Sequence, residues 1–322
     1  MILQDLHPRV LSTIHAGQKG HSPIEETPGA VMYIGPDSVA LVQHFCMHLS
    51  TADGIRSIVD CGTGSGIQGL TAAISAECED VTLVDINPRA LKFARFNFLL
   101  NGLSEPTLLL GDLRTEYGQQ WLKKDEDAAF YHSRPRPWKE LLPAEIDLLL
   151  SNPPFLPVPI SDDVINKRYG LFSGGGESGE DLLRIVVSLA STLLAEKGML
   201  AIVSEFMNPD SVPIRVKGWW GDESVGKGLL LTNEYPIDDK TYSERRADSA
   251  AEMEVWKKHL QNEGIQLVSP GLLFVRKDDD SSQDEMKVRH EKIPKTTQGS
   301  IWTPANKLAV DFTRNAYQTD FG

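Results

Sequence analysis

The residues Asn152-Pro153-Pro154-Phe155 are the part of the sequence best suited to chemistry. They follow an apolar run, residues 146–151, that is typical of a buried strand, and two consecutive prolines cannot continue a central strand. The strand therefore ends in a short polar side chain on a stiff backbone. The Asn152 carboxamide oxygen and the Pro153 carbonyl oxygen can accept the two hydrogens of a planar amino group, while the Phe155 ring covers its face. This pattern predicts a site that holds an –NH2 group.

A glycine-rich loop upstream predicts a second part of the same site. Residues 60–66, Asp-Cys-Gly-Thr-Gly-Ser-Gly, follow the apolar pair Ile58-Val59 and precede the helical residues 67–76. A strand, a glycine-rich turn and a helix let the backbone approach a ligand closely. The next strand, residues 81–84, ends in Asp85, and an acid in that place commonly binds ribose hydroxyls. We interpret the loop as a ligand site, with a dinucleotide site and a purely structural turn as the alternatives.

These motifs carry a family resemblance. Residues 58–206 resemble the class I S-adenosylmethionine-dependent methyltransferases, in which a glycine-rich loop, an acid after strand two, an acidic turn after strand three (here Gly111-Asp112-Leu113) and Asn-Pro-Pro-Phe after strand four follow in this order. The segment 85–97 narrows the resemblance to the small-domain branch that methylates amide or amino nitrogens. That branch includes release-factor glutamine, ribosomal-RNA guanine-N2 and adenine-N6 methyltransferases.

The resemblance implies a cofactor and a role for each site residue. The cofactor would be S-adenosyl-L-methionine, with S-adenosyl-L-homocysteine as product, bound by Asp60, Gly62, Thr63, Gly64, Gly66, Asp85, Ile86, Asp112, Leu113 and Asn152. Within that set, the loop would contact the methionine part, Asp85 the ribose and Asp112 the adenine amino group. The expected catalytic residues are Asn152, Pro153 and Phe155, and the expected substrate-binding residues are Pro154, Phe155 and Tyr33.

Alternating strands and helices must position these residues. Strands over 57–60, 81–85 and 107–111, separated by helices over 67–77 and 88–101, predict a Rossmann-like α/β fold with helices on both faces of a sheet. By resemblance the sheet would be mostly parallel and seven-stranded. We expect an irregular segment over 1–36 that covers the site, a methyltransferase domain over 37–276 with an insertion at about 114–143, and a polar, partly docked tail over 277–322.

Two helix starts near the site are predicted from capping residues. Asp37 or Ser38 is expected to cap a helix over 39–45, and Ser178 is expected to cap a helix over 182–194. The glycines that precede Ser178, residues 174–176, suit a substrate-binding turn or a lid as well as a simple helix entry.

The composition limits the classes of protein to which this chain can belong. The 322 residues are 41% hydrophobic and 24% charged, as in an ordinary globular protein, and no apolar run is long enough to cross a bilayer. No secretory signal is evident, so we expect a cytoplasmic protein with three reduced cysteines. His44 and His48 are spaced to share a helix face, but no third ligand accompanies them, and no metal site is expected.

The net charge of −13 disfavours nucleic acid as a partner, because phosphate contacts need a basic surface. Arg134, Arg136 and Lys139 lie near Tyr131 and Trp138 in the insertion, and we interpret this cluster as a solvated loop rather than a polynucleotide channel. The resemblance implies a protein glutamine or a nucleobase as the acceptor. A small-molecule amine or guanidine acceptor and a non-catalytic cofactor-binding scaffold stay open, and the oligomeric state is not predicted.

Overall fold

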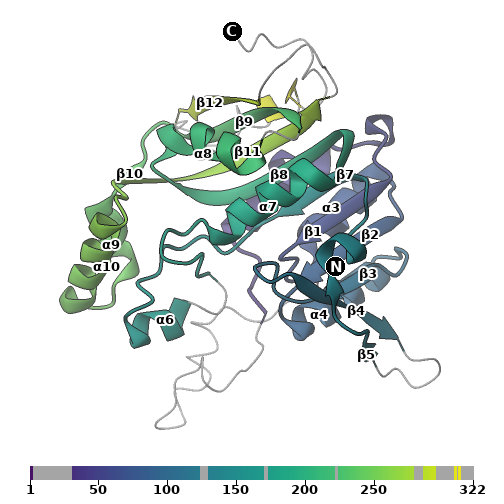
Figure 1. The fold of residues 1–322 in the computed structure, drawn as a ribbon, viewed down its shortest axis with the longest axis horizontal. Helices are drawn as coiled ribbons and strands as arrows, with labels where there is room; N and C mark the ends of the chain where they lie inside the picture. The colour runs from purple at the N-terminus through teal and green to yellow at the C-terminus, as the bar shows by residue number, and fades with distance from the viewer. Residues whose placement is uncertain are drawn as a thin grey trace.

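The computed structural model describes residues 1–2, 31–123, 130–169, 173–221, 224–278, 286–294, 308–309 and 311–312. Its main feature is one large sheet, in the order β12-β9-β11-β8-β7-β1-β2-β3-β4-β5 (Figure 1). The strands are β1 (Ser57–Cys61), β2 (Asp80–Asp85), β3 (Thr107–Leu110), β4 (Tyr117–Lys123), β5 (Phe130–His132), β6 (Arg136–Pro137), β7 (Ile146–Ser151), β8 (Leu194–Met207), β9 (Val225–Asn233), β10 (Ile237–Asp238), β11 (Leu267–Asp278) and β12 (Lys287–Ile293).

The centre of the sheet confirms the predicted α/β fold class. Strands β3, β2, β1, β7 and β8 pair in parallel, and β11 runs antiparallel between β8 and β9. Within the described residues the sheet continues beyond these seven strands to twelve, so the expected number of seven does not describe the whole sheet. On one edge β4 and β5 add antiparallel pairs, and on the other β12 pairs in parallel with β9. Residues of the expected insertion and tail thus belong to the sheet, and the three predicted segment boundaries stay a prediction.

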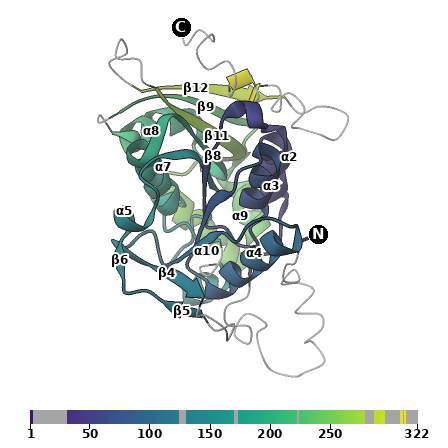
Figure 2. The same ribbon diagram turned by 90° about the vertical axis from the view of Figure 1, so that its right-hand side faces the viewer.

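Helices cover both faces of the sheet (Figure 2). On one side lie α2 (Pro36–His44), α3 (Ile67–Ala76) and α4 (Pro88–Leu100), and on the other α5 (Trp138–Leu141), α7 (Asp181–Leu193) and α8 (Val212–Trp220). The start of α4 follows local rules, since Asn87 accepts a hydrogen bond from the Arg89 amide and Pro88 occupies the first turn. Among the described helices, none is long and apolar enough to cross a membrane.

Two predicted helix caps are wrong. The helix α2 begins at Pro36 with Gly35 as its cap residue, because the side chains of Asp37 and Ser38 turn away from the helix end to another partner. The helix α7 begins after Glu180, and Ser178 accepts only a long bond from the Glu180 amide, at 3.3 Å. For Asp37 and Ser38 a contact with the distant Asn152 decides where the polar side chain points, which local sequence does not encode.

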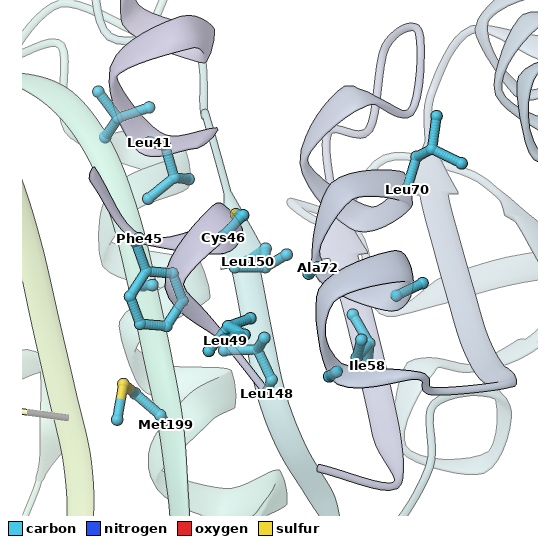
Figure 3. Close-up of a cluster of buried hydrophobic side chains, with 14 of the residues drawn as sticks. Leu41, Phe45, Cys46, Leu49, Ile58, Leu70, Ala72, Leu148, Leu150 and Met199 are labelled. Carbon is cyan, nitrogen blue, oxygen red and sulfur yellow. The ribbon is translucent and has the colours of Figure 1, made fainter. Parts of the chain in front are cut away.

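The core beneath α2 fixes this helix against the sheet. Leu41, Phe45 and Leu49 of the segment that contains α2 are buried against Leu148 of β7 and Met199 of β8 (Figure 3). Apolar burial of this extent contributes roughly 1.5–3 kcal/mol for each large side chain. The first turn of α2 is therefore held in a fixed place relative to the end of β7.

A smaller apolar cluster supports the chain that follows Asn-Pro-Pro-Phe. It includes Leu156, Tyr242 and Trp256, and it joins α6 (Asp163–Tyr169), α9 (Asp239–Arg246) and α10 (Ala250–Asn262), which lie to the left of the sheet in Figure 1. Glu205 of β8 binds this group to the sheet, because its carboxylate accepts hydrogen bonds from the Tyr242 hydroxyl and the Arg246 guanidinium, each at 2.8 Å. Phe155 packs against the edge of the cluster.

Candidate active site

A pocket of about 530 Å³ opens where the carboxyl ends of β1, β2, β3 and β7 meet. Ligands in open α/β sheets bind at this edge. The strand ends are tied together, since the Ser151 hydroxyl donates to the Cys61 carbonyl oxygen at 2.8 Å. The pocket walls come from the glycine-rich loop, the ends of β2 and β3, the Asn-Pro-Pro-Phe segment, residues 173–175 and residues 31–38.

The glycine-rich loop presents its backbone to the pocket. Gly62, Gly64 and Gly66 have φ of 70°, 54° and 83°, which side chains rarely adopt. The Gly62 and Thr63 amides donate to the Val84 carbonyl oxygen at 2.9 and 3.0 Å, and this pair fixes the loop to β2. At Gly66 a Cβ atom would lie 2.9 Å from that of Ala94, so this glycine serves the close packing of α3 on α4 and does not line the pocket.

Asp60 lies beneath the loop rather than in the pocket wall. It is fully buried, and its Oδ2 accepts from the Thr63 hydroxyl at 2.8 Å and the Gly69 amide at 3.1 Å. Its Oδ1 has no hydrogen-bond partner within the described residues. Burial raises the pKa of Asp60 to about 6, against the opposing effect of those two hydrogen bonds. The residue thus shapes the loop and places an ionisable group behind it.

Asp85, at the end of β2, holds the glycine-rich loop in place by a hydrogen bond. Its Oδ2 accepts from the Gly64 amide at 2.9 Å and its Oδ1 from the Asn87 amide at 2.8 Å. Burial raises the pKa of this carboxyl as well. Asp85 and the neighbouring Ile86, whose side chain is 56% exposed, both line the pocket. A carboxylate and an apolar side chain side by side suit a ligand with hydroxyl groups beside a flat ring.

Asp112 follows β3 and is paired with Arg114. The guanidinium donates to both carboxylate oxygens at 2.8–3.0 Å, and these hydrogen bonds lower the pKa of Asp112. Both residues and Leu113 line the pocket. A carboxylate has further lone pairs, so Asp112 retains the capacity to accept from an amino group while Arg114 holds it.

Asn152 stands at the end of β7 with its two amide ends in different environments. Its Nδ2 donates to Asp37 Oδ2 at 2.9 Å and to the Ser38 hydroxyl at 3.0 Å. Its Oδ1 is buried and has no hydrogen-bond partner within the described part of the chain. A buried, unsatisfied oxygen in a pocket wall is costly unless a ligand supplies the donor. Asn152 therefore offers a single acceptor to whatever occupies the pocket.

The rest of the motif is held by the glycine-rich turn over residues 173–179. The Leu156 amide donates to the Ser173 carbonyl oxygen at 2.7 Å and the Gly175 amide returns a bond to Leu156 at 2.9 Å. A Cβ atom on Gly175 would lie 2.7 Å from the Pro154 carbonyl oxygen, and one on Gly179 would lie 2.5 Å from that of Phe155. These glycines are present because the turn lies directly against the backbone of Asn-Pro-Pro-Phe.

The structure brings most of the expected site residues together. The pocket is lined by Gly62, Thr63, Gly64, Asp85, Ile86, Asp112, Leu113, Asn152, Pro153, Pro154, Phe155 and Tyr33, and it is not lined by Asp60 or Gly66. Sequence reasoning missed Asp37, Ser38, Gln68 and Arg114, which also line it. Gln68 is 2% exposed and its Nε2 has no hydrogen-bond partner within the described residues. Among those residues, no three His, Cys, Asp or Glu side chains gather as a metal site.

Comparisons with known proteins agree with this geometry. A model of the methyltransferase small domain matches residues 34–121. A release factor glutamine methyltransferase from Deinococcus radiodurans is 26% identical over 218 residues, which cover 61% of this chain and 68% of that protein. A ribosomal protein uL3 glutamine methyltransferase from Francisella tularensis is 24% identical over 202 residues, which cover 61% of this chain and 57% of that protein.

The match to these two relatives therefore spans only part of their length. Among solved structures, a predicted O-methyltransferase from Agrobacterium tumefaciens is 17% identical, with a TM-score of 0.44 over 84% of this chain and 94% of that chain, an overlap too loose to bear on activity. The matched domain covers the loop, Asp85 and Asp112, and the curated relatives extend over a longer part of the chain. Residues 34–121 thus match the methyltransferase small domain, and the chain is similar over about 61% of its length to two glutamine methyltransferases.

Proposed function

We propose that this protein transfers a methyl group from S-adenosyl-L-methionine to a planar amide or amino nitrogen. The observation that carries the proposal is Asn152 Oδ1, a buried acceptor in the pocket wall with no partner within the described residues. An acceptor in that place fits an N–H donor and does not fit a carboxylate or a carbonyl oxygen. The proposal makes Asn152, Pro153 and Phe155 the catalytic residues.

The residues of the pocket fit the cofactor. Gly64 has open space where a Cβ would stand, so the loop backbone can approach a ligand closely, and Asp85 presents a carboxylate beside it. In the proposal the loop residues Gly62, Thr63 and Gly64 hold the methionine part, with Gly66 and Asp60 supporting them from behind. Asp85 and Ile86 hold the ribose and its surroundings, and Asp112 and Leu113 hold the adenine.

When bound, S-adenosyl-L-methionine supplies an electrophilic methyl group on a sulfonium sulfur. The protein then has to orient the acceptor nitrogen toward that methyl group, since the lone pair of an amide or exocyclic amine is conjugated and the nitrogen is a poor nucleophile. Asn152 Oδ1 accepts one hydrogen of the –NH2 group, and the Pro153 carbonyl oxygen accepts the other. Both bonds strengthen as positive charge grows on the nitrogen. Phe155 and Pro154 cover the faces of the planar group and exclude water.

We propose a protein glutamine carboxamide as the first acceptor to test, and a nucleobase as the second. Two curated relatives are named as glutamine methyltransferases of proteins. The net charge of −13 disfavours nucleic acid, and Trp138 of the basic cluster is buried and unable to stack on a base. The three buried, unpaired cysteines suit a reducing compartment, and we place the reaction in the cytoplasm.

The decisive variant is Asn152→Ala. We expect methyl transfer to fall about 100-fold or more, because the acceptor nitrogen loses its orienting partner, as for loss of one transition-state hydrogen bond. Affinity for S-adenosyl-L-homocysteine, measured by calorimetry, should change by less than about threefold. Transfer of labelled methyl groups into fractionated extract measures activity and identifies the acceptor class.

Asn262→Ala, at the exposed end of α10, is the matched control and should leave both readouts unchanged. Wild-type protein that binds no S-adenosyl-L-methionine would sink the proposal. Wild-type protein that binds it but transfers nothing to any fraction would favour the scaffold alternative instead.

A further inference from the structure

The Asn152 carboxamide is held from behind by two side chains of the first turn of α2. Asp37 Oδ2 lies 2.9 Å from Asn152 Nδ2, and the Ser38 hydroxyl lies 3.0 Å from the same nitrogen. These residues are more than a hundred positions away in sequence, and both line the pocket. Neither caps α2, whose cap residue is Gly35. Their polar groups are thus directed to Asn152, and the N-terminus of α2 has no side-chain cap hydrogen bond.

The chemistry of Asp37 decides which way the amide faces. An ionised carboxylate accepts hydrogen bonds and donates none, whereas an amide has one accepting and one donating end. If the Asn152 amide rotated by half a turn, its oxygen would face the Asp37 carboxylate oxygen, and the two would repel. The favourable arrangement puts Nδ2 toward Asp37 and Oδ1 toward the pocket. A neutral environment would leave both orientations accessible.

The backbone near Asp37 leaves room for this arrangement. A Cβ atom on Gly35 would lie 2.4 Å from Asp37 Oδ1, so the carboxylate occupies the space that a side chain at position 35 would need. The buried Leu41 and Phe45 anchor α2 in the core, and the first turn has little freedom to withdraw. Asp37 and Asn152 are therefore fixed from two separate elements that meet only in the folded protein.

We propose that Asp37, assisted by Ser38, is a positioning residue that locks the Asn152 amide with Oδ1 toward the acceptor. This inference rests on the proposed function and narrows its substrate class. With the amide locked, the site takes acceptors whose nitrogen carries at least one hydrogen to donate. It rejects nitrogens without a hydrogen, such as tertiary amines, and oxygen acceptors that present only lone pairs.

The test compares Asp37→Ala, Asp37→Asn and Ser38→Ala. Removal of a hydrogen bond to a charged group corresponds to a loss of about 10- to 100-fold in kcat for Asp37→Ala. Asp37→Asn keeps an oxygen that can accept from Asn152, but its NH2 group could also donate to the oxygen of a rotated Asn152 amide, so its kcat should fall between those of wild type and Asp37→Ala. Ser38→Ala should lose about two- to fivefold, since Asp37 still holds the amide. KM for the acceptor should change less than kcat in Asp37→Ala.

A second measurement, of the Asn152 side-chain amide, can be made without a methyl-acceptor substrate. The side-chain amide signals of Asn152, assigned by their absence in Asn152→Ala, are measured by NMR in protein labelled with ¹⁵N-asparagine. Hydrogen bonding to Asp37 and Ser38 should slow the exchange of these protons with solvent. Asp37→Ala should speed the exchange, and Asp37→Asn should give an intermediate rate. Asp163→Ala, an exposed acid in the first turn of α6, is the matched control.

The proposed function and the positioning role of Asp37 can be rejected separately. If wild type transfers no methyl group, the proposed function fails, and the NMR comparison alone still decides the role of Asp37. If Asp37→Ala keeps kcat within twofold of wild type, or if the neutral Asp37→Asn is as fast as wild type, the locking role of the Asp37 carboxylate is overturned. Unchanged Asn152 exchange in Asp37→Ala overturns it as well.

Discussion

At the scale of single residues, two carboxylates next to the glycine-rich loop, Asp60 beneath it and Asp85 in the pocket wall, set the electrostatics of the pocket. Burial raises the pKa of Asp60 to about 6 and raises that of Asp85. The folded protein thus holds the Asp60 proton to higher pH than the unfolded chain does. Asp60 therefore stabilises the folded state most at pH values below the pKa that it has in the unfolded chain. This stabilisation is lost as the pH rises through about 6. Above that pH the loop carries a buried negative charge that favours a cation.

This charge predicts a pH dependence of cofactor binding. S-adenosyl-L-methionine carries one net positive charge, and S-adenosyl-L-homocysteine carries none. With the Asp60 pKa at about 6, binding of the charged cofactor should strengthen about fourfold between roughly pH 5.5 and pH 7, with proton release. The neutral product should show a weaker dependence. Calorimetry in buffers of different ionisation enthalpy measures both the affinity and the protons released.

Asp60→Asn is the variant that isolates the effect. It keeps a group that can accept from Thr63 and Gly69 but cannot ionise, so the slope of affinity against pH should flatten. Equal slopes for cofactor and product, or an unchanged slope in Asp60→Asn, would assign the dependence to another group.

Sequence reasoning reached those residues of the site that stand at the ends of strands. Asn152, the loop glycines, Asp85 and Asp112 each stand at the end of a strand, where local pattern predicts both the element and the pocket edge. Asp37 and Ser38 gave no such signal, because their partner Asn152 lies far away in sequence and only the fold brings them together. Arg114 was missed for the opposite reason, since its neighbour Asp112 had already been given a role with the ligand.

At the scale of elements, the glycine-rich turn and Asn-Pro-Pro-Phe behave as one unit. Gly179 has φ of 78°, and a Cβ atom there would meet the Phe155 carbonyl oxygen at 2.5 Å. Gly179→Ala should therefore displace Phe155, lower the free energy of unfolding by more than about 2 kcal/mol and lower methyl transfer about tenfold. Chemical denaturation and the labelled-methyl assay measure the two effects.

Gly102→Ala is the control that separates the backbone strain of Gly179→Ala from its steric clash with Phe155. Gly102 has φ of 76° and open space around its Cβ position, so the substitution carries the strain of a left-handed residue alone, about 1 kcal/mol. It should leave methyl transfer unchanged. If Gly179→Ala is no worse than Gly102→Ala in both measurements, the turn does not hold the motif.

The elements that sequence pattern predicted well are those with local start and stop signals. The observed β1, α3, β2, α4 and β3 lie within a residue or two of their predicted bounds. The strands β4 and β12 were not predicted, because each gains its pairing from a sheet edge rather than from its own pattern. In the insertion, Trp138 packs where Cβ atoms on Gly111 and Gly118 would stand, which brings that chain onto the sheet. A contact of this kind is visible only in three dimensions.

At the scale of the whole molecule, the sheet brings both ends of the described chain to one core. Residues 31–34, 37 and 38 line the pocket, and the segment from α2 through Leu49 packs on the sheet beside Phe274 of β11. Ala309 and Phe312, from the last described part of the chain, are buried in the same cluster. Ala309 and Phe312 belong to the segment expected to be a polar, partly docked tail, and they supply part of the apolar interior that fixes α2, and with it Asp37.

This arrangement predicts that Phe312 contributes strongly to stability. Phe312 is 1% exposed, and its ring centroid lies 6.5 Å from that of Phe274, which lies 5.2 Å from that of Phe45. Phe312→Ala should lower the free energy of unfolding by about 3–5 kcal/mol, as for other buried phenylalanines, in urea denaturation monitored by tryptophan fluorescence. Tyr235→Ala, at a side chain that is 72% exposed, should change it by less than about 0.5 kcal/mol. A loss below about 1 kcal/mol for Phe312→Ala would mean that this segment does not belong to the core.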